Sequence, residues 1–305
     1  MKLQVTHHTR YEYAPAVETA QHIACLKPVD SNNQSLLAHS LHIEPTPSQR
    51  VEQHDVFKNA QTFFSLESPH DTLEVISRST VETVVPPTYP STITWDAVRE
   101  QFRYKAGSPF DPANEFVFPS HHVKRHEDFA NYARESFTPG RPLLEAAQNL
   151  MHRIYTDFTY ESNSTEINTP ALEALAARRG VCQDFAHIMI ACLRSMGLSA
   201  RYVSGYLLTH PAPGKERLIG SDASHAWVSI YLPDLPGASE GAGWWDLDPT
   251  NDNDGWGSPG EDYIRLAFGR DFSDVSPIRG VIYGGAKHTL SVAVTVEPIT
   301  QEAIR

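Results

Sequence analysis

The first part of the chain alternates between apolar and polar positions with the period of two that is typical of β-strands. Tyr11 and Tyr13 show this alternation, and so do residues 72–83. Residues 56–59 and 62–66 are predicted as two further strands around a short turn. No long helical pattern interrupts this part, and Pro, Asn and Ser separate its apolar runs. The pattern predicts a small all-β sandwich or barrel domain over residues 1–88.

The periodicity changes after a proline-rich linker at residues 86–90. Apolar side chains then recur at helical spacing over residues 141–155 and 182–196. Strands are predicted next, at residues 200–208, 223–232, 244–248 and, last, 289–298. Helices followed by strands favour an α+β domain over residues 89–305, with helices packed on an antiparallel sheet. The last strand could pack on either of the two sheets.

Composition and charge narrow the range of functions. The chain has 305 residues, is 40% hydrophobic and carries a formal net charge of −12, so a folded core is expected and a nucleic-acid partner is not. No apolar run reaches the ~18 residues that span a membrane, and the first residues lack the apolar stretch of a secretory signal. We therefore expect a cytoplasmic protein without a membrane partner; the oligomeric state stays open.

One of the three cysteines occupies a position that favours reactivity. Cys182 follows Gly180 at the start of the predicted helix 182–196, where the positive end of the helix dipole favours a thiolate. An inert cysteine at a helix start would give the same pattern. Cys192 falls on the apolar stripe of that helix and Cys25 lies in the β-rich part, so both are expected to be structural. No C-x-x-C pair indicates a zinc site.

A histidine and a carboxylate follow Cys182 in an order that suits nucleophilic catalysis. His225 is predicted at the start of a strand, and Asp248 at the end of the next, directly before Pro249. Neighbouring antiparallel strands would bring an imidazole and a carboxylate together, so that the carboxylate orients the ring. Asp246 is predicted on the same face as Asp248. A surface histidine and a turn-capping aspartate remain the alternatives.

Three motifs resemble those of the transglutaminase-like superfamily of cysteine hydrolases. They are Gly-Val-Cys-Gln-Asp-Phe-Ala-His at 180–187, Ser-His-Ala-Trp at 224–227 and Asp-Pro-Thr-Asn at 248–251. Tyr11-Glu12-Tyr13 and Phe57-Lys58-Asn59 resemble the β-domain that precedes this core in bacterial members. The resemblance implies a papain-like core and amide chemistry through a thioester. By this resemblance Cys182 is the nucleophile, His225 the base and Asp248 the orienting carboxylate, with no cofactor or metal.

Several readings of the function remain open. The chain could hydrolyse amide bonds as a peptidase or amidase, transfer the acyl group of glutamine to an amine, or bind peptides without turnover. Its substrate could be a peptide, a protein or a small amide. Tyr160 and Gln183 are both candidates for the second oxyanion donor. Residues 250–261 approach the spacing of a calcium loop but depart from it at several positions, so a solvated acidic turn is expected there.

Overall fold

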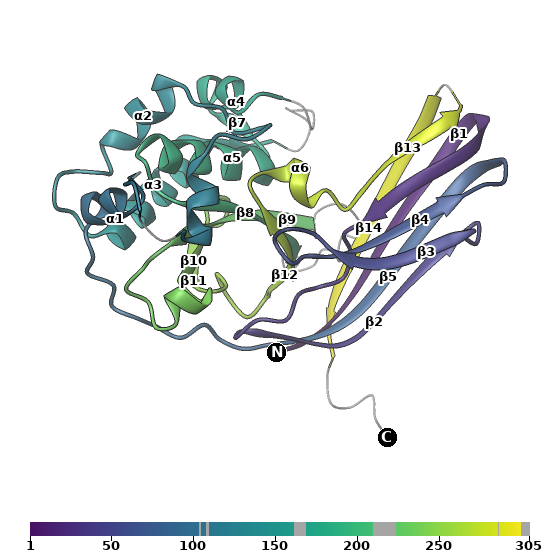
Figure 1. Cartoon of the computed structure of the whole chain (residues 1–305), viewed down its shortest axis with the longest axis horizontal. Coiled ribbons are helices and arrows are strands. Elements are labelled where there is room, and N and C mark those ends of the chain that lie inside the picture. Colours follow the sequence, from purple (N-terminus) through teal and green to yellow (C-terminus); the bar gives the residue numbers. More distant parts are fainter. Residues whose placement is uncertain (104, 108–109, 162–168, 210–223, 286, 300–305) are drawn as a thin grey trace, which may run out of the picture.

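The computed structural model describes all residues except 104, 108–109, 162–168, 210–223, 286 and 300–305. A β-rich part and a part that mixes helices with a second sheet lie side by side (Figure 1). The predicted fold class is confirmed: an α+β core is accompanied by an N-terminal β-rich region.

The β-rich part is one antiparallel sheet built around the long strand β1 (Lys2–Ala24). The first half of β1 pairs with β5 and β14, and its second half pairs with β4 and β13. The other strands of this sheet are β2 (Gln34–Glu44), β3 (Gln49–His54), β4 (Ala60–Leu66), β5 (His70–Thr83), β13 (Ile278–Gly284) and β14 (Lys287–Pro298).

The sheet bends sharply at the middle of β1 and folds onto itself. The ring centroids of Tyr11 and His22 lie 6.4 Å apart, although an extended strand would separate these residues by more than ~30 Å. The pairing of β1 with β5 shifts register between Glu12 and Val17, at the level of the bend. A strand that crosses such a bend contributes to both layers of a sandwich.

The C-terminal strands return to the sheet in which the chain begins. β13 and β14 run antiparallel to β1 along most of its length, as the yellow strands in Figure 1 show. The last strand, whose placement was open in the sequence, therefore joins the N-terminal sheet. A domain boundary between residues 88 and 89 stays a prediction, but residues 278–298 share a sheet with β1.

One predicted strand is wrong, because residues 55–59 form a turn. The Asp55 side chain accepts hydrogen bonds from the backbone N–H groups of Phe57 (2.9 Å) and Asn59 (2.8 Å), which closes the turn locally. The side-chain amide of Asn59 then forms two hydrogen bonds with Phe268 on β12 (Tyr263–Gly269). Its Nδ2 donates to the Phe268 carbonyl at 2.7 Å, and its Oδ1 accepts from the Phe268 N–H at 3.0 Å. The turn thus attaches the β-rich part to the second sheet.

Helix α5 (Cys182–Ser195) is the centre of the α+β part. Most of it is buried, and it packs on β9 and β8. A helix that is buried on almost every side is expected to be apolar around its whole circumference, as residues 185–193 largely are. The other helices are α1 (Trp95–Gln101), η1 (Pro112–Val117), α2 (Glu127–Arg134), α3 (Leu143–Asp157), α4 (Ala171–Ala177), η3 (Ala238–Glu240) and α6 (Phe272–Val275).

The second sheet is antiparallel and has the strand order β11-β10-β9-β8-β12. Its members, besides β12, are β8 (Ala200–Leu207), β9 (Ser224–Tyr231), β10 (Trp244–Asp248) and β11 (Asn253–Trp256). Two short parallel strands, β6 (Thr159–Tyr160) and β7 (Arg179–Gly180), pair with each other, and β7 lies directly before α5. Tyr206 and Ile264 belong to the same buried cluster as Leu3 and Val5, so the two parts share a core.

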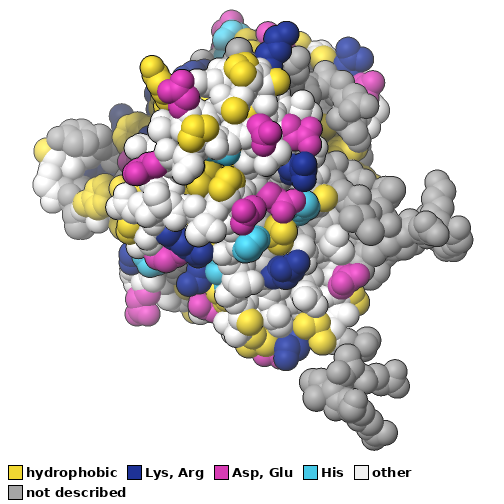
Figure 2. All heavy atoms as spheres, turned by 90° about the vertical axis from the view of Figure 1, so that its right-hand side faces the viewer, with side chains coloured by type: hydrophobic (Ala, Val, Ile, Leu, Met, Phe, Trp, Pro, Cys, Tyr) yellow, Lys and Arg dark blue, Asp and Glu magenta, His cyan; other side chains and the backbone are white. Residues whose placement is uncertain are grey.

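The outer surface of the β-rich part is mixed in character. In Figure 2, acidic, basic and hydrophobic side chains intersperse over this face, and no large described area carries one kind alone. Among the described residues, no helix combines the length and apolar character that crossing a bilayer requires.

Candidate active site

Cys182 is the first residue of α5, and the turn before it fixes where the helix begins. The Asp184 carboxylate accepts a hydrogen bond from the Val181 N–H at 2.9 Å. Gly180 makes this possible, because a Cβ at that position would lie 2.7 Å from Asp184 Oδ2. The Cys182 thiol therefore sits at the positive end of the helix dipole, and it is only partly buried.

The structure brings Cys182, His225 and Asp248 together from α5, β9 and β10. The Nε2–H of His225 donates to Asp248 Oδ2 at 2.7 Å. The Cys182 side chain also forms a hydrogen bond with the His225 ring. Since Nε2 faces the carboxylate, Nδ1 is the ring nitrogen left for the thiol. This is the order of contacts that a nucleophile, a base and an orienting carboxylate require.

Burial and the contacts with Asp248 and Cys182 act in opposite directions on the pKa of His225. Burial of the imidazole is the largest single effect and lowers its pKa. The Asp248 charge and hydrogen bonds to Asp248 and Cys182 together outweigh burial and raise the His225 pKa to about 10. Burial likewise favours a neutral Asp248, but the His225 charge and several donated hydrogen bonds lower the Asp248 pKa below its usual value. The pair is therefore an imidazolium and a carboxylate at neutral pH.

Two residues that the sequence analysis did not assign to the site hold the Asp248 carboxylate in place. The Tyr263 hydroxyl and the Asn251 amide each donate to Asp248 Oδ2 at 2.7 Å. The Asn251 amide nitrogen also lies 3.3 Å from His225 Nε2, but both are donors, so its hydrogen bond goes to the carboxylate. Asn251 belongs to the motif at 248–251 and could have been found there. Tyr263 gives no sequence signal.

Tyr263 reaches Asp248 because a glycine leaves space on the intervening strand. It lies on β12, which is separated from β10 by β8 and β9. Gly205 on β8 has no side chain, and a Cβ there would lie 2.5 Å from the ring of Trp227. That ring in turn packs edge-on against Tyr263, with centroids 5.5 Å apart.

Asp246 lies on the same strand face as Asp248 but contacts other residues. It accepts hydrogen bonds from Trp227 Nε1 (2.8 Å), from the Ser229 hydroxyl and from Arg265 Nη2 (2.7 Å). Asp246 is fully buried, so it balances the charge of the buried Arg265. The structure thus places Asp248, and not Asp246, against His225.

Cys25 and Cys192 are both buried, unlike Cys182. Burial raises the pKa of the Cys25 thiol to about 12, with a smaller contribution from Asp55. Burial also raises the Cys192 pKa well above its usual value. These two thiols stay protonated at neutral pH and are inert by comparison.

The two candidate oxyanion donors both belong to elements near the start of α5. Tyr160 ends β6, which pairs with β7 directly before the helix, and its ring centroid is 6.3 Å from that of Phe185. Gln183 follows Cys182 in the first turn of α5. Both positions are near the helix start, and the choice between them stays a prediction.

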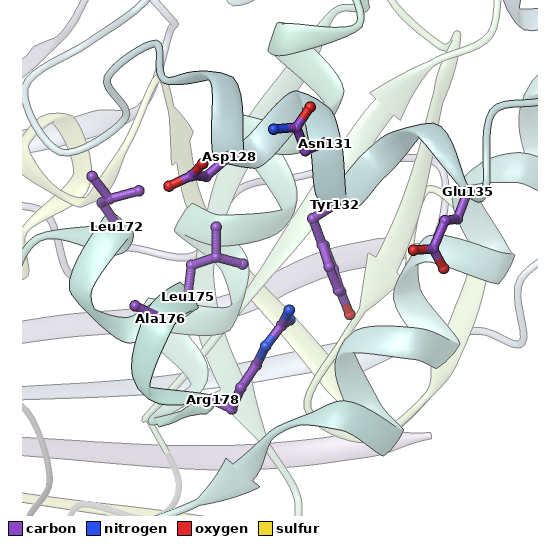
Figure 3. A pocket seen from close by; sticks show the side chains of 8 residues that line it. All are labelled: Asp128, Asn131, Tyr132, Glu135, Leu172, Leu175, Ala176 and Arg178. Atoms are coloured by element: carbon purple, nitrogen blue, oxygen red, sulfur yellow. The ribbon is translucent and has the colours of Figure 1, made fainter.

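A groove of about 420 Å³ lies between α2 and α4, away from these three residues (Figure 3). Its lining does not include Cys182, His225 or Asp248. The Tyr132 ring in its wall packs against Phe158, which packs against Phe185 of α5. The groove is lined by Asp128, Asn131, Tyr132, Glu135, Leu172, Leu175, Ala176 and Arg178.

Residues 250–261, expected to form a solvated acidic turn, include strand β11, and their carboxylates are bound by protein donors, which corrects the expectation from sequence. Asp254 Oδ2 accepts hydrogen bonds from Trp245 Nε1 (2.7 Å) and Gln148 Nε2 (2.9 Å). Asp252 Oδ2 lies 2.7 Å from His152 Nδ1. Protein donors thus bind carboxylates that a calcium loop would use. No group of three or more His, Cys, Asp or Glu residues that could hold a metal is found in the described part of the chain.

Comparisons with known proteins agree with this architecture. The family described as "Bacterial transglutaminase-like N-terminal region" matches residues 3–82, and "Transglutaminase-like superfamily" matches residues 130–249. An uncharacterized protein of Mycobacterium tuberculosis is 42% identical over 309 residues, covering 99% of this chain and 95% of its own length. A protein-glutamine gamma-glutamyltransferase of Pseudomonas aeruginosa is 29% identical over 140 residues, covering 43% of this chain and 19% of that protein.

One solved structure shares the fold over almost the whole chain. A protein of Cytophaga hutchinsonii proposed to be a cysteine protease has a TM-score of 0.69 and 20% identity, covering 98% of this chain and 92% of that one. The match to the transglutaminase-like superfamily, over residues 130–249, includes Cys182, His225 and Asp248. The match to the bacterial N-terminal region, over residues 3–82, covers most of the β-rich part. The chain therefore belongs to the transglutaminase-like superfamily, with the bacterial N-terminal β-region ahead of its core.

Proposed function

We propose that the protein is a cysteine-dependent amide-bond hydrolase that works through a thioester, with Cys182, His225 and Asp248 as its catalytic triad. The observation that carries the proposal is the chain of contacts from the partly exposed Cys182 thiol through His225 to the buried Asp248. Its substrate is a peptide, a protein or a small amide. We also propose a cytoplasmic location and no nucleic-acid or membrane partner.

The proposed reaction follows from the order of contacts among the three groups. The Cys182 thiolate attacks the amide carbonyl and forms a tetrahedral intermediate. The His225 imidazolium gives its proton to the leaving amine as the C–N bond breaks. Neutral His225 then takes a proton from water as the water oxygen attacks the thioester. Collapse of this second tetrahedral intermediate breaks the C–S bond, releases the acid and restores the Cys182 thiolate beside the His225 imidazolium. Asp248 keeps the ring oriented and stabilises its charged form.

The negative charge on the tetrahedral oxygen needs two donors. The backbone N–H of Cys182 is one, because the first N–H groups of a helix have no partner within the helix. Tyr160 or Gln183 would supply the other. Removing one oxyanion donor typically costs about 10²–10³-fold in kcat, so Tyr160→Phe and Gln183→Ala distinguish the two.

Acyl transfer to an amine is the second candidate. It is favoured by the similarity to a protein-glutamine gamma-glutamyltransferase over 140 residues. Hydrolysis and transfer share every step up to the thioester and differ only in whether water or an amine resolves it. Adding a primary amine to a turnover assay separates them, since a transferase converts the acyl group into a new amide and a hydrolase releases the acid.

The first test is alkylation with iodoacetamide at pH 7, followed by mass spectrometry of the labelled peptides. We expect Cys182 to react at least about 100-fold faster than Cys25 and Cys192, because only its thiol is accessible and paired with an imidazolium. The two buried cysteines are internal controls in the same molecule. Equal labelling of the three thiols would falsify the activated nucleophile.

The second test is turnover of an amide library by Cys182→Ala, with Cys25→Ala as the matched control. We expect Cys182→Ala to stay folded and to lose turnover, and Cys25→Ala to keep it. Turnover that survives in Cys182→Ala would rule out covalent catalysis at this residue. Folded protein that turns over no amide and whose Cys182 is unreactive would favour the third reading, a peptide-binding module.

A further inference from the structure

β14 is an outer strand among the described strands of its sheet. It pairs with β1 from Leu3 to Ala14, and its other edge pairs with no described strand. Side chains at residues 287–292 are exposed on both faces of this strand. Such an edge presents a row of backbone N–H and C=O groups that can pair with another chain.

The middle of β14 carries neither prolines nor charged side chains. The strand order ends at β2 on one side and at β3 on the other. Pro45 and Pro47 follow β2 and Arg50 and Glu52 add charge to β3, while residues 34–43 of β2 also lack Pro and charge. Residues 288–296 of β14 contain no Pro, Asp, Glu, Lys or Arg. Prolines and charges are the usual means of blocking an edge, so residues 288–296 are open to pairing with a partner strand.

We propose that this partner is a second copy of the chain, with the two β14 strands paired antiparallel about a two-fold axis at Val292. Among the possible antiparallel registers, charge complementarity selects this one. Lys287 and Glu297 flank the uncharged segment at equal distance from Val292, so each faces the other in the partner copy. A shift of two residues in either direction separates both charge pairs.

The same register matches both faces of the strand. On the face of Lys287 and Glu297, alternation places Thr289 opposite Thr295 of the partner subunit, a pairing that antiparallel sheets favour. On the other face Val292 meets its own copy, and Leu290 meets Val294 of the partner subunit. Leu290 and Val292 are 44% and 36% exposed in the single chain. The partner would cover this apolar surface and satisfy the free backbone groups.

The test is the molar mass of the full chain by light scattering and sedimentation over a range of concentrations. We expect a dimer of twice the 34.0 kDa chain mass. Val292→Lys places two ammonium groups opposite each other at the axis and is expected to weaken the dimer at least about tenfold. Val51→Lys is the matched control, since Val51 is 42% exposed on the outer strand β3, which pairs with β4 and not with β14, and should leave the dimer intact.

A charge exchange tests the register. Lys287→Glu and Glu297→Lys alone each create like-charge pairs and are expected to weaken the dimer, and the double variant is expected to restore it. Circular dichroism and thermal unfolding confirm that the variants fold. A chain that is monomeric at every concentration overturns the proposal, and so does a dimer that Val292→Lys leaves unchanged. Failure of the double exchange overturns the register.

Discussion

At the scale of single residues, the protonation state of His225 depends on one carboxylate. The Asp248 charge raises the imidazole pKa, and burial alone would lower it. Asp248→Asn is therefore expected to move the His225 pKa from about 10 to lower pH, by about one pH unit or more. NMR titration of the labelled imidazole measures this shift without a substrate. In a turnover assay, the loss of activity at high pH should move in the same direction.

Asp246→Asn is the matched control on the same strand. Asp246 makes no hydrogen bond to His225, so the His225 titration should stay near that of the wild type. The fold should lose about 3–5 kcal/mol, because Arg265 is left as a buried cation without its partner. Ser229→Ala, which removes one donor to Asp246, replaces this control if Asp246→Asn does not fold. Equal shifts in the Asp248 and Asp246 variants would contradict the assignment.

At the scale of the element, the start of α5 depends on Gly180. A Cβ at this residue would displace the Asp184 carboxylate from the Val181 N–H. Gly180→Ala is expected to cost about 1–2 kcal/mol, the cost of losing a helix cap, and to slow alkylation of Cys182. Urea unfolding and the iodoacetamide rate measure the two effects.

Gly280→Ala serves as the control for that substitution. A Cβ at Gly280 would collide with the His22 ring in the β-rich part, far along the chain from α5. It should lower the stability without changing the rate at which folded protein is alkylated at Cys182. If both glycine variants slowed alkylation equally, the effect would come from general loosening of the fold and not from the helix start.

At the scale of the whole molecule, three buried neutral histidines make the fold sensitive to acid. Burial, with a smaller contribution from a neighbouring histidine, lowers the pKa of His7 and of His22 to about 4. Burial lowers that of His187 to about 3. Between pH 6.5 and 4 the unfolded chain binds protons at these residues and the folded chain does not. Stability should therefore fall as the pH falls, by up to about 1.4 kcal/mol per pH unit for each histidine.

Urea unfolding at several pH values between 7 and 4 measures this slope. His22 has no hydrogen-bond partner on either ring nitrogen among the described residues, so His22→Phe removes a titrating group without breaking a hydrogen bond. In this variant the free energy of unfolding should change less steeply with pH, because the unfolded chain binds up to one proton fewer in this range. His225 acts in the opposite direction: its raised pKa stabilises the fold below pH 6.5 and loses this effect as the pH rises through about 10. An unchanged slope in His22→Phe would exclude the buried ring as the cause.

The sequence by itself determined which segments form most of the helices and strands, and which three residues to examine for catalysis. Periodicity and short motifs are local properties, so they can be read without knowing what lies nearby. The alternation of apolar and polar residues wrongly predicted a strand at residues 56–59, because the side chain of Asp55 closes a turn there.

Only the tertiary structure decided which distant residues meet. It placed the Tyr263 hydroxyl on Asp248 across two intervening strands, and the last strand against the first. It also showed that the Asp254 carboxylate accepts a hydrogen bond from Trp245, in a segment that the sequence analysis expected to be solvated. The physical reason is that such contacts depend on strand order, on the bend of β1 and on the space that Gly205 leaves open. These properties belong to the packed chain and have no counterpart in the spacing of its residues.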